Sequence, residues 1–197
     1  IDPAKIANGI NATQIADGSV SNTEFQYINT VTSNVQTQIN DLVAGALPAT
    51  LYALIQDQKA TGVHGGTFTS GAWQTRNLNT EVIDANNIVT IAANQFTLQA
   101  GTYRIRAEAP AYGVDYHKAK LYNITDAADV AGCLGSSAAN TVPSGTITSS
   151  IISSQFTISA QKVFEIRHYS TSTYADSGFG YATNIATYIE IYTRVEI

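Results

Sequence analysis

The chain of 197 residues is 44% hydrophobic but only 13% charged, about half the charged share of an ordinary soluble domain. Its formal net charge is −5 and no segment clusters Lys with Arg, so nucleic-acid binding through a basic face is not expected. No apolar run reaches the roughly 18 residues of a membrane-spanning helix, and the first residues do not form a signal peptide. Because the chain begins at Ile1 and contains no Met, we expect it to be a fragment of a longer polypeptide.

Residues 1–24 contain a short internal repeat. The segments KIANGINAT (5–13) and QIADGSVSN (14–22) align nine residues apart and share an Ile-Ala-x-Gly pattern. Units with so few apolar side chains bury little surface within one chain. The pattern indicates a fibrous shaft in which partner chains complete the core, and a flexible linker is the alternative.

The period changes to that of a helix between residues 25 and 62. Ile28, Val31, Val35, Ile39 and Leu42 form one narrow apolar seam with steps of three, four, four and three. Thr, Ser, Asn and Gln separate them, and these residues are middling or poor helix formers. Because a short helix of this kind is marginal in water, the seam predicts oligomerisation, with a locally underwound supercoil.

A break at Gly45 and Pro48 interrupts this helix. A second apolar stripe then follows, and the glycine-rich segment 59–66 is expected to end the helical stalk. The members of this second stripe are Leu47, Leu51, Leu54 and Ile55.

From Thr67 onward the pattern is that of β-strands. Apolar and polar residues alternate in 102–109 and again in 188–197. In the last strand the alternation places the isoleucines toward the core and Tyr188 and Tyr192 on a polar face, which favours a contact between subunits. The other predicted strands are 88–92, 94–98, 117–124, 130–134, 146–158 and 162–169. Short strands at this spacing are typical of a sandwich, jelly roll or barrel.

One internal match supports the jelly roll. QFTLQAGTYRIR (95–106) is similar to QFTISAQKVFEIR (155–167), with one inserted residue. Each copy is interpreted as a hairpin of two strands joined by a tight turn. Two similar hairpins suit the paired Greek keys of a jelly roll, and a chance match is the alternative.

Two parts of the chain resemble known families. The segment QIADGSVSNTEFQYINTVTSNVQTQINDL resembles the shaft repeats of bacteriophage tail fibres, over about residues 5–42. The block from GGTFTSGAW through NQFTLQAGTYRIRAEAPAY and HKAKLYNIT to YIEIYTRVEI resembles the TNF-like, complement-globular-head jelly roll, over about 65–197. Both resemblances imply a homotrimer, and neither implies a cofactor or a catalytic centre.

The direction of successive strands predicts which loops share an end. If the C-terminus lies at the stalk end of the head, the loops near 111–116, 136–145 and 170–184 lie at the far tip. Aromatic side chains among small polar residues there suit contact with sugars or proteins. The candidate receptor-binding residues are Tyr112, Asp115, Tyr116, Asn140, Tyr174, Asp176, Phe179 and Tyr181.

The sequence offers little evidence of catalysis. A polysaccharide hydrolase needs two carboxylates in one cleft, but Asp115, Asp126, Asp129 and Asp176 each lie in turn-like sequence and are interpreted as turn caps. No nucleophile motif is present, and we predict that the chain is not an enzyme.

Three further residue types are candidates for sites. The histidines lack zinc-type spacing, so no metal is predicted, although His64 at the entrance to a trimeric head could place three copies on an axis. The single cysteine, Cys133, is interpreted as a buried apolar residue. Trp73 is either packed under the sheet edge or exposed as a ligand anchor.

The predicted organisation is a mainly β protein with three parts: shaft repeats (1–24), a helical coiled-coil stalk (25–62) and a jelly-roll head (63–197). The predicted function is that of the C-terminal part of a trimeric phage tail fibre, located in the virion, which binds a host-cell glycan or protein without cofactors. Other virion or tail proteins are expected to bind through an N-terminal region that precedes Ile1. The residues predicted to hold the trimer are Ile28, Val31, Val35, Ile39, Leu42, Leu47, Leu51 and Leu54. Open alternatives are a structural trimerisation module or head fibre, a depolymerase, and a cellular adhesin.

Overall fold

The computed structural model describes residues 23, 35–46, 51–140 and 145–197, in two units, Ile1–Thr50 and Leu51–Ile197. The first unit contains helix α4 (Val35–Ala46), on which Val35, Ile39 and Leu42 are 49%, 47% and 70% exposed. This part of the predicted seam is therefore helical and open to solvent in the single chain. The shaft repeats, Ile28, Val31 and Leu47 lie outside the described residues.

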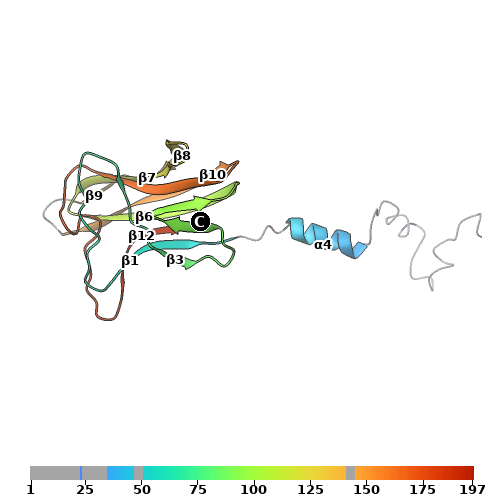
Figure 1. Ribbon diagram of the computed structural model, residues 1–197, viewed down its shortest axis with the longest axis horizontal. Coiled ribbons are helices and arrows are strands. Elements are labelled where there is room, and N and C mark those ends of the chain that lie inside the picture. The colour runs from blue at the N-terminus through green and yellow to red at the C-terminus, as the bar shows by residue number, and fades with distance from the viewer. Residues whose placement is uncertain (1–22, 24–34, 47–50, 141–144) are drawn as a thin grey trace, which may run out of the picture. The chain divides into compact units, whose positions relative to one another are not determined.

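The second unit is a sandwich of two antiparallel sheets (Figure 1). One sheet has the strand order β10-β6-β12-β1-β3; the other has the order β4-β5-β11-β7-β8, with β2 beside β11 and β9 beside β7. The strands are β1 (Leu54–Lys59), β2 (Gln74–Thr75), β3 (Thr80–Ile83), β4 (Val89–Ala92), β5 (Gln95–Leu98), β6 (Gly101–Tyr112), β7 (Asp115–Asn123), β8 (Ala128–Leu134), β9 (Ala138–Asn140), β10 (Ile147–Ile158), β11 (Lys162–Ser170) and β12 (Glu190–Glu196). This arrangement is a jelly roll, as predicted.

The predicted helical stripe through Leu54 was wrong. Residues 54–59 form β1, which lies between β12 and β3, and Leu54 is buried within the single chain. Ala53 and Ile55 face the core and are fully buried. A short apolar run does not distinguish a strand from a helix by its period, and pairing within the sheet decides the outcome. The β unit therefore begins at Leu51 rather than at residue 63.

The two similar segments are related by the fold, but they are not hairpins. Each segment crosses from one sheet to the other: β5 and β11 lie in the seven-stranded sheet, and β6 and β10 in the five-stranded sheet. The copies pair with each other, so that Phe96 lies opposite Phe164 and Phe156 lies opposite Tyr103. The rings of both pairs are 5.8 Å apart, and Phe156 contacts Phe164 at 5.4 Å. Both copies of the repeated sequence therefore contribute aromatic rings to the same centre of the core.

A bulge in β12 reverses the predicted alternation of the last strand. Arg194 pairs with Gln56, but Ile191 pairs with Gln58, so three positions of β12 match two of β1. Val195 faces the core as predicted, whereas Ile191 is 48% exposed and Tyr192 is buried. The prediction that Tyr192 lies on an exposed polar face was therefore wrong.

The chain enters and leaves the sandwich at the same end. Ala53 and Ile197 exchange backbone hydrogen bonds of 2.9 and 3.0 Å. The loops that follow β1, β6 and β11, together with the start of β10, lie at the opposite end, which we call the loop end (Figure 1). The predicted grouping of loops is confirmed. His64 belongs to the loop end, so its predicted position at the entrance to the head was wrong.

Candidate functional site

Four of the eight predicted receptor-binding residues meet at the loop end, together with one histidine. His64, Tyr112, Tyr174, Asp176 and Tyr181 form what we call the loop-end cluster. The ring of Tyr112 lies 5.2 Å from Tyr174 and 4.9 Å from Tyr181, and the ring of Tyr181 lies 4.5 Å from His64. His64 Nε2 is 3.8 Å from Asp176 Oδ2. The cluster combines aromatic faces, hydroxyl groups and one carboxylate.

Backbone pairing between two loops holds this cluster in place. The Gly65 N–H donates to the Gly180 carbonyl at 2.9 Å, and the Gly66 N–H donates to the Asp176 carbonyl at 2.8 Å. Phe68 and Tyr174 form an isolated β-bridge. The loops are thus tied together across more than a hundred residues of sequence, which keeps the aromatic rings pre-positioned.

Gly113 is required for the position of Tyr174. Its φ of 63° lies in the left-handed region, and a Cβ there would lie 2.6 Å from the Tyr174 ring. The Tyr174 ring can therefore pack against the β6–β7 turn because residue 113 has no side chain.

Phe179 does not belong to the exposed part of the loop end. It is only 9% exposed and stacks 4.5 Å from Phe68 beneath the loops. The prediction that Phe179 contacts a receptor was therefore wrong, because two aromatic residues of the loops are used to fill a second, smaller core under them.

A buried arginine joins this small core to the sheets. Arg76 is fully buried and donates to the Thr193 hydroxyl at 2.8 Å, the Pro110 carbonyl at 3.1 Å and the Phe179 carbonyl at 2.9 Å. Burial lowers the pKa of its guanidinium to about 9, while the Asp57 charge acts to raise it. The side chain therefore remains charged at neutral pH and links three segments near the loop end.

Two buried histidines lie beside Arg76. His117 Nδ1 is 2.9 Å from His168 Nε2, and His117 Nε2 is 2.8 Å from the Thr148 hydroxyl. Burial and the Arg76 charge lower the pKa of His117 to about 4 and hold the pKa of His168 well below its usual value. Both rings are neutral at pH 7, and they support the loop end from inside the sandwich.

Asn140 is also a structural residue. It is 3% exposed, accepts a 2.7 Å hydrogen bond from the Val114 N–H, and donates one of 2.8 Å to the Ala111 carbonyl. Its predicted role in receptor contact was wrong, because its amide satisfies buried backbone groups at the β6–β7 turn.

The remaining two predicted residues lie outside the cluster. Asp115 has a φ of 59° and accepts a hydrogen bond from the Ser172 hydroxyl. Tyr116 is 70% exposed, and its ring stands on the outer face of the seven-stranded sheet. The structure therefore separates the predicted tip residues into a partly exposed cluster, buried residues that support it, and a second surface.

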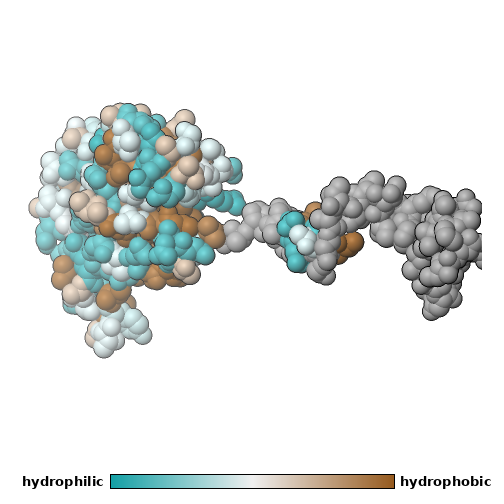
Figure 2. Space-filling view, turned by 45° about the vertical axis from the view of Figure 1, so that its right-hand side comes forward, coloured by the Kyte–Doolittle hydropathy of each residue, from teal (hydrophilic) through white to brown (hydrophobic). Residues whose placement is uncertain are grey.

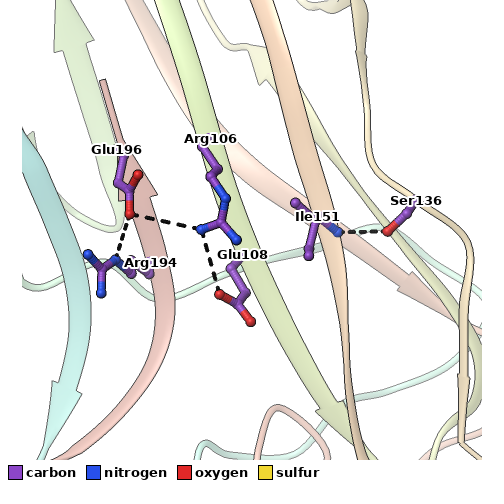
Figure 3. Close-up of polar contacts among 6 residues, drawn as sticks. All are labelled: Arg106, Glu108, Ser136, Ile151, Arg194 and Glu196. Atoms are coloured by element: carbon purple, nitrogen blue, oxygen red, sulfur yellow. Dashed lines mark hydrogen bonds and ion pairs between the residues drawn. The ribbon is translucent and has the colours of Figure 1, made fainter.

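The outer face of the five-stranded sheet carries a balanced set of charges (Figure 3). Arg106 lies opposite Glu196, and Arg194 lies opposite Glu108. The Arg106 Nη1 atom is 3.9 Å from both Glu108 and Glu196, and Arg194 Nε is 3.0 Å from Glu196. All four side chains are partly exposed, so the charges cancel on a surface that remains accessible.

Exposed apolar side chains lie on the same sheet as this charged quartet. Ile151 lies opposite Glu108, Ile191 opposite Gln58, Ile83 opposite Leu54, and Ile147 opposite Tyr112. Their exposed fractions range from 36% to 48%. Figure 2 shows such apolar patches between hydrophilic side chains on the sandwich. Exposed isoleucines together with a quartet of charges that cancel are suited to contact with another protein surface.

Two of the candidate carboxylates, Asp126 and Asp129, are held by neighbouring side chains. Asp126 accepts from the Asn123 side-chain amide at 2.8 Å in a turn, as predicted, and pairs with Lys162 at 2.5 Å. Asp129 pairs with Lys120 at 2.6 Å. Among the described residues, no three metal-ligating side chains come together, and no helix there is long and apolar enough to cross a bilayer.

Comparison with known proteins gives similarity at the level of shape only. No protein-family model matches the chain, and no curated protein matches it. The globular domain of zebrafish complement 1qA protein is similar to it with 13% identity and a TM-score of 0.43, over 75% of this chain and 94% of that one. Murine APRIL at pH 8.0 is similar with 5% identity and a TM-score of 0.45, over 74% of this chain and 97% of that one. The fold assignment rests on the strand order described above.

Proposed function

We propose that the chain is part of a homotrimeric bacteriophage tail fibre whose jelly-roll head attaches the virion to a host-cell glycan or protein. The observation that carries this proposal is the loop-end cluster. It presents aromatic and hydroxyl groups at the end of the sandwich opposite Ala53 and Ile197, where the chain enters and leaves. The sequence resemblance of residues 5–42 to phage fibre shafts gives the proposal its viral context.

Self-association is supported by exposed apolar surface in each of the two units. In the helix these are Val35, Ile39 and Leu42, and in the sandwich they are the isoleucines of the five-stranded sheet. A trimer would cover both sets and present three loop-end clusters together. Weak contacts at each cluster would then add through multivalency, and no catalysis is required.

Binding to host cells tests this function. The labelled 1–197 protein is sized by light scattering and then titrated onto a panel of candidate bacterial hosts. A trimer that binds one host saturably is expected. Tyr181→Ala, at a residue 46% exposed in the cluster, should weaken binding at least tenfold, because each trimer loses three ring contacts. Tyr52→Ala is the matched control, since Tyr52 is 39% exposed near the opposite end.

The main alternative is a structural trimerisation module or head fibre with recognition elsewhere in the virion. A trimer that binds none of the hosts, or that binds one equally well after Tyr181→Ala, would favour this alternative over adhesion through the loop end. A monomer would contradict both.

A further inference from the structure

A hollow lies on the outer face of the seven-stranded sheet, away from the loop-end cluster. It has a volume of about 200 Å³. Its walls come from β7, the end of β11 and the connection between β8 and β9, and include Tyr116, Lys118, Ser137, Tyr169 and Thr171. This volume is below the range of pockets for drug-sized ligands and suits a single small unit.

Two further cations on β7 and β11 are each paired with a carboxylate. Lys120 Nζ is 2.6 Å from Asp129 and lies 4.1 Å above the Trp73 ring. Arg167 Nε is 2.5 Å from Glu165. In contrast, Lys118 forms no ion pair with any residue that the structure describes, and no acidic residue lines the hollow. One uncompensated positive charge therefore borders the hollow of a protein with a net charge of −5.

The other walls offer aromatic surface and hydroxyl groups. The Tyr116 ring is 70% exposed, and Tyr169 lies directly opposite Lys118 on the neighbouring strand. Tyr169 is extended by Trp73, whose ring centre is 5.6 Å away. The C–H faces of a pyranose pack on such rings, while tyrosine and serine hydroxyls exchange hydrogen bonds with sugar hydroxyls.

We propose that this hollow binds a sugar unit that carries a carboxylate, with Lys118 pairing with the carboxylate and Tyr116 and Tyr169 contacting the ring. A single lysine is too little positive charge for nucleic acid, which requires a basic patch or stripe. The hollow lies on the sandwich face opposite the charged quartet, so it remains open if the five-stranded sheet is covered by other copies of the chain. The site therefore does not depend on the proposed assembly.

Trp73 provides the measurement, because it is the only tryptophan and contacts Tyr169. The full chain is titrated with galacturonic acid oligosaccharides and its tryptophan fluorescence is recorded. The expected result is a saturable change, at least tenfold weaker with the methyl-esterified oligosaccharides, which keep the sugar ring but lose the charge. Dextran sulfate should not reproduce the saturable change, because it offers charge without a carboxylate on the pyranose.

Variants then test the residues. Lys118→Gln should weaken binding of the acidic oligosaccharide at least tenfold, and Lys118→Arg should retain most of it. Lys59→Gln, which removes one charge from the five-stranded sheet, should leave the affinity unchanged. The proposal is overturned if the oligosaccharides cause no change, if the methyl esters or dextran sulfate bind as well, or if Lys118→Gln binds like the unsubstituted protein.

Discussion

The buried histidines couple the stability of the head to pH. His117 and His168 are held neutral by burial next to Arg76, and the pKa of His117 is lowered to about 4. An unfolded histidine has a pKa of about 6.5. Between these two values the unfolded chain binds more protons than the folded chain, so the free energy of unfolding decreases as the pH falls. The stabilisation is complete above about pH 6.5 and is lost progressively toward pH 4.

From His117 alone we expect the free energy of unfolding to fall by about 2 kcal/mol between pH 7 and pH 5. Urea unfolding at both pH values measures it. His117→Gln should be less stable at pH 7 but should lose less stability on acidification. Ile152→Val is the control, because it removes one methyl group from the core without changing a titratable group. If His117→Gln and Ile152→Val respond equally to pH, the histidine pair is not the cause.

At the scale of elements, the bulge in β12 is the feature that decides which side chains are available to a partner. It leaves Ile191 exposed and Val195 fully buried, although simple alternation assigns both to the core. We expect Ile191→Thr to change the free energy of unfolding by less than about 0.5 kcal/mol. Val195→Thr should cost about 1–3 kcal/mol, because it buries a hydroxyl group among apolar side chains.

Urea unfolding at a concentration where the protein does not associate compares these two substitutions. Sedimentation at higher concentration then tests the surface role: Ile191→Thr should weaken association. Equal costs of unfolding for both variants would show that Ile191 packs into the core and that the bulge is absent.

The strands with clear alternation could be predicted from the sequence, and the exceptions have physical reasons. β1 reads as a continuation of the helical stripe, since Leu51, Leu54 and Ile55 fit a helical period as well as a buried strand. β2 and β9, of two and three residues, are too short to show a period. The similar segments 95–106 and 155–167 predicted the jelly roll correctly, but they did not show that each segment changes sheet.

The loop-end cluster could be predicted in part, because strand direction alone brings Tyr112, Tyr174 and Tyr181 to one end. Sequence did not distinguish the exposed ring of Tyr181 and the half-buried rings of Tyr112 and Tyr174 from Phe179, which is buried above Arg76. His64 was not included because the return of the loop after β1 is fixed by pairing with residues far along the chain. Burial and long-range pairing are properties of the folded molecule, and a local sequence pattern does not predict them.

At the scale of the whole molecule, α4 provides the sharpest test of assembly. A helix of 12 residues is marginal in water, and it has no acidic residue in its first turn and no basic residue in its last turn to stabilise it. Its apolar residues Val35, Ile39 and Leu42 lie at steps of four and three along one side and are exposed. In the proposed trimer, three chains of 20.9 kDa form each particle, and burial of this side against the other copies would stabilise the helix.

Leu42→Lys places a charge in this seam and should dissociate the trimer at concentrations where the unsubstituted protein remains assembled. Thr37→Lys is the matched control, because it adds the same charge to the same helix at an exposed polar position. Light scattering gives the mass, and circular dichroism near 222 nm should show a loss of helix in Leu42→Lys only. The β-sheet signal should persist in both variants, since the core of the sandwich is contained within residues 51–197. If the trimer persists in Leu42→Lys with its helix intact, the helix is not needed to hold the chains together. The contact between chains would then lie on the sandwich, where the charged quartet and the exposed isoleucines are the candidate interface.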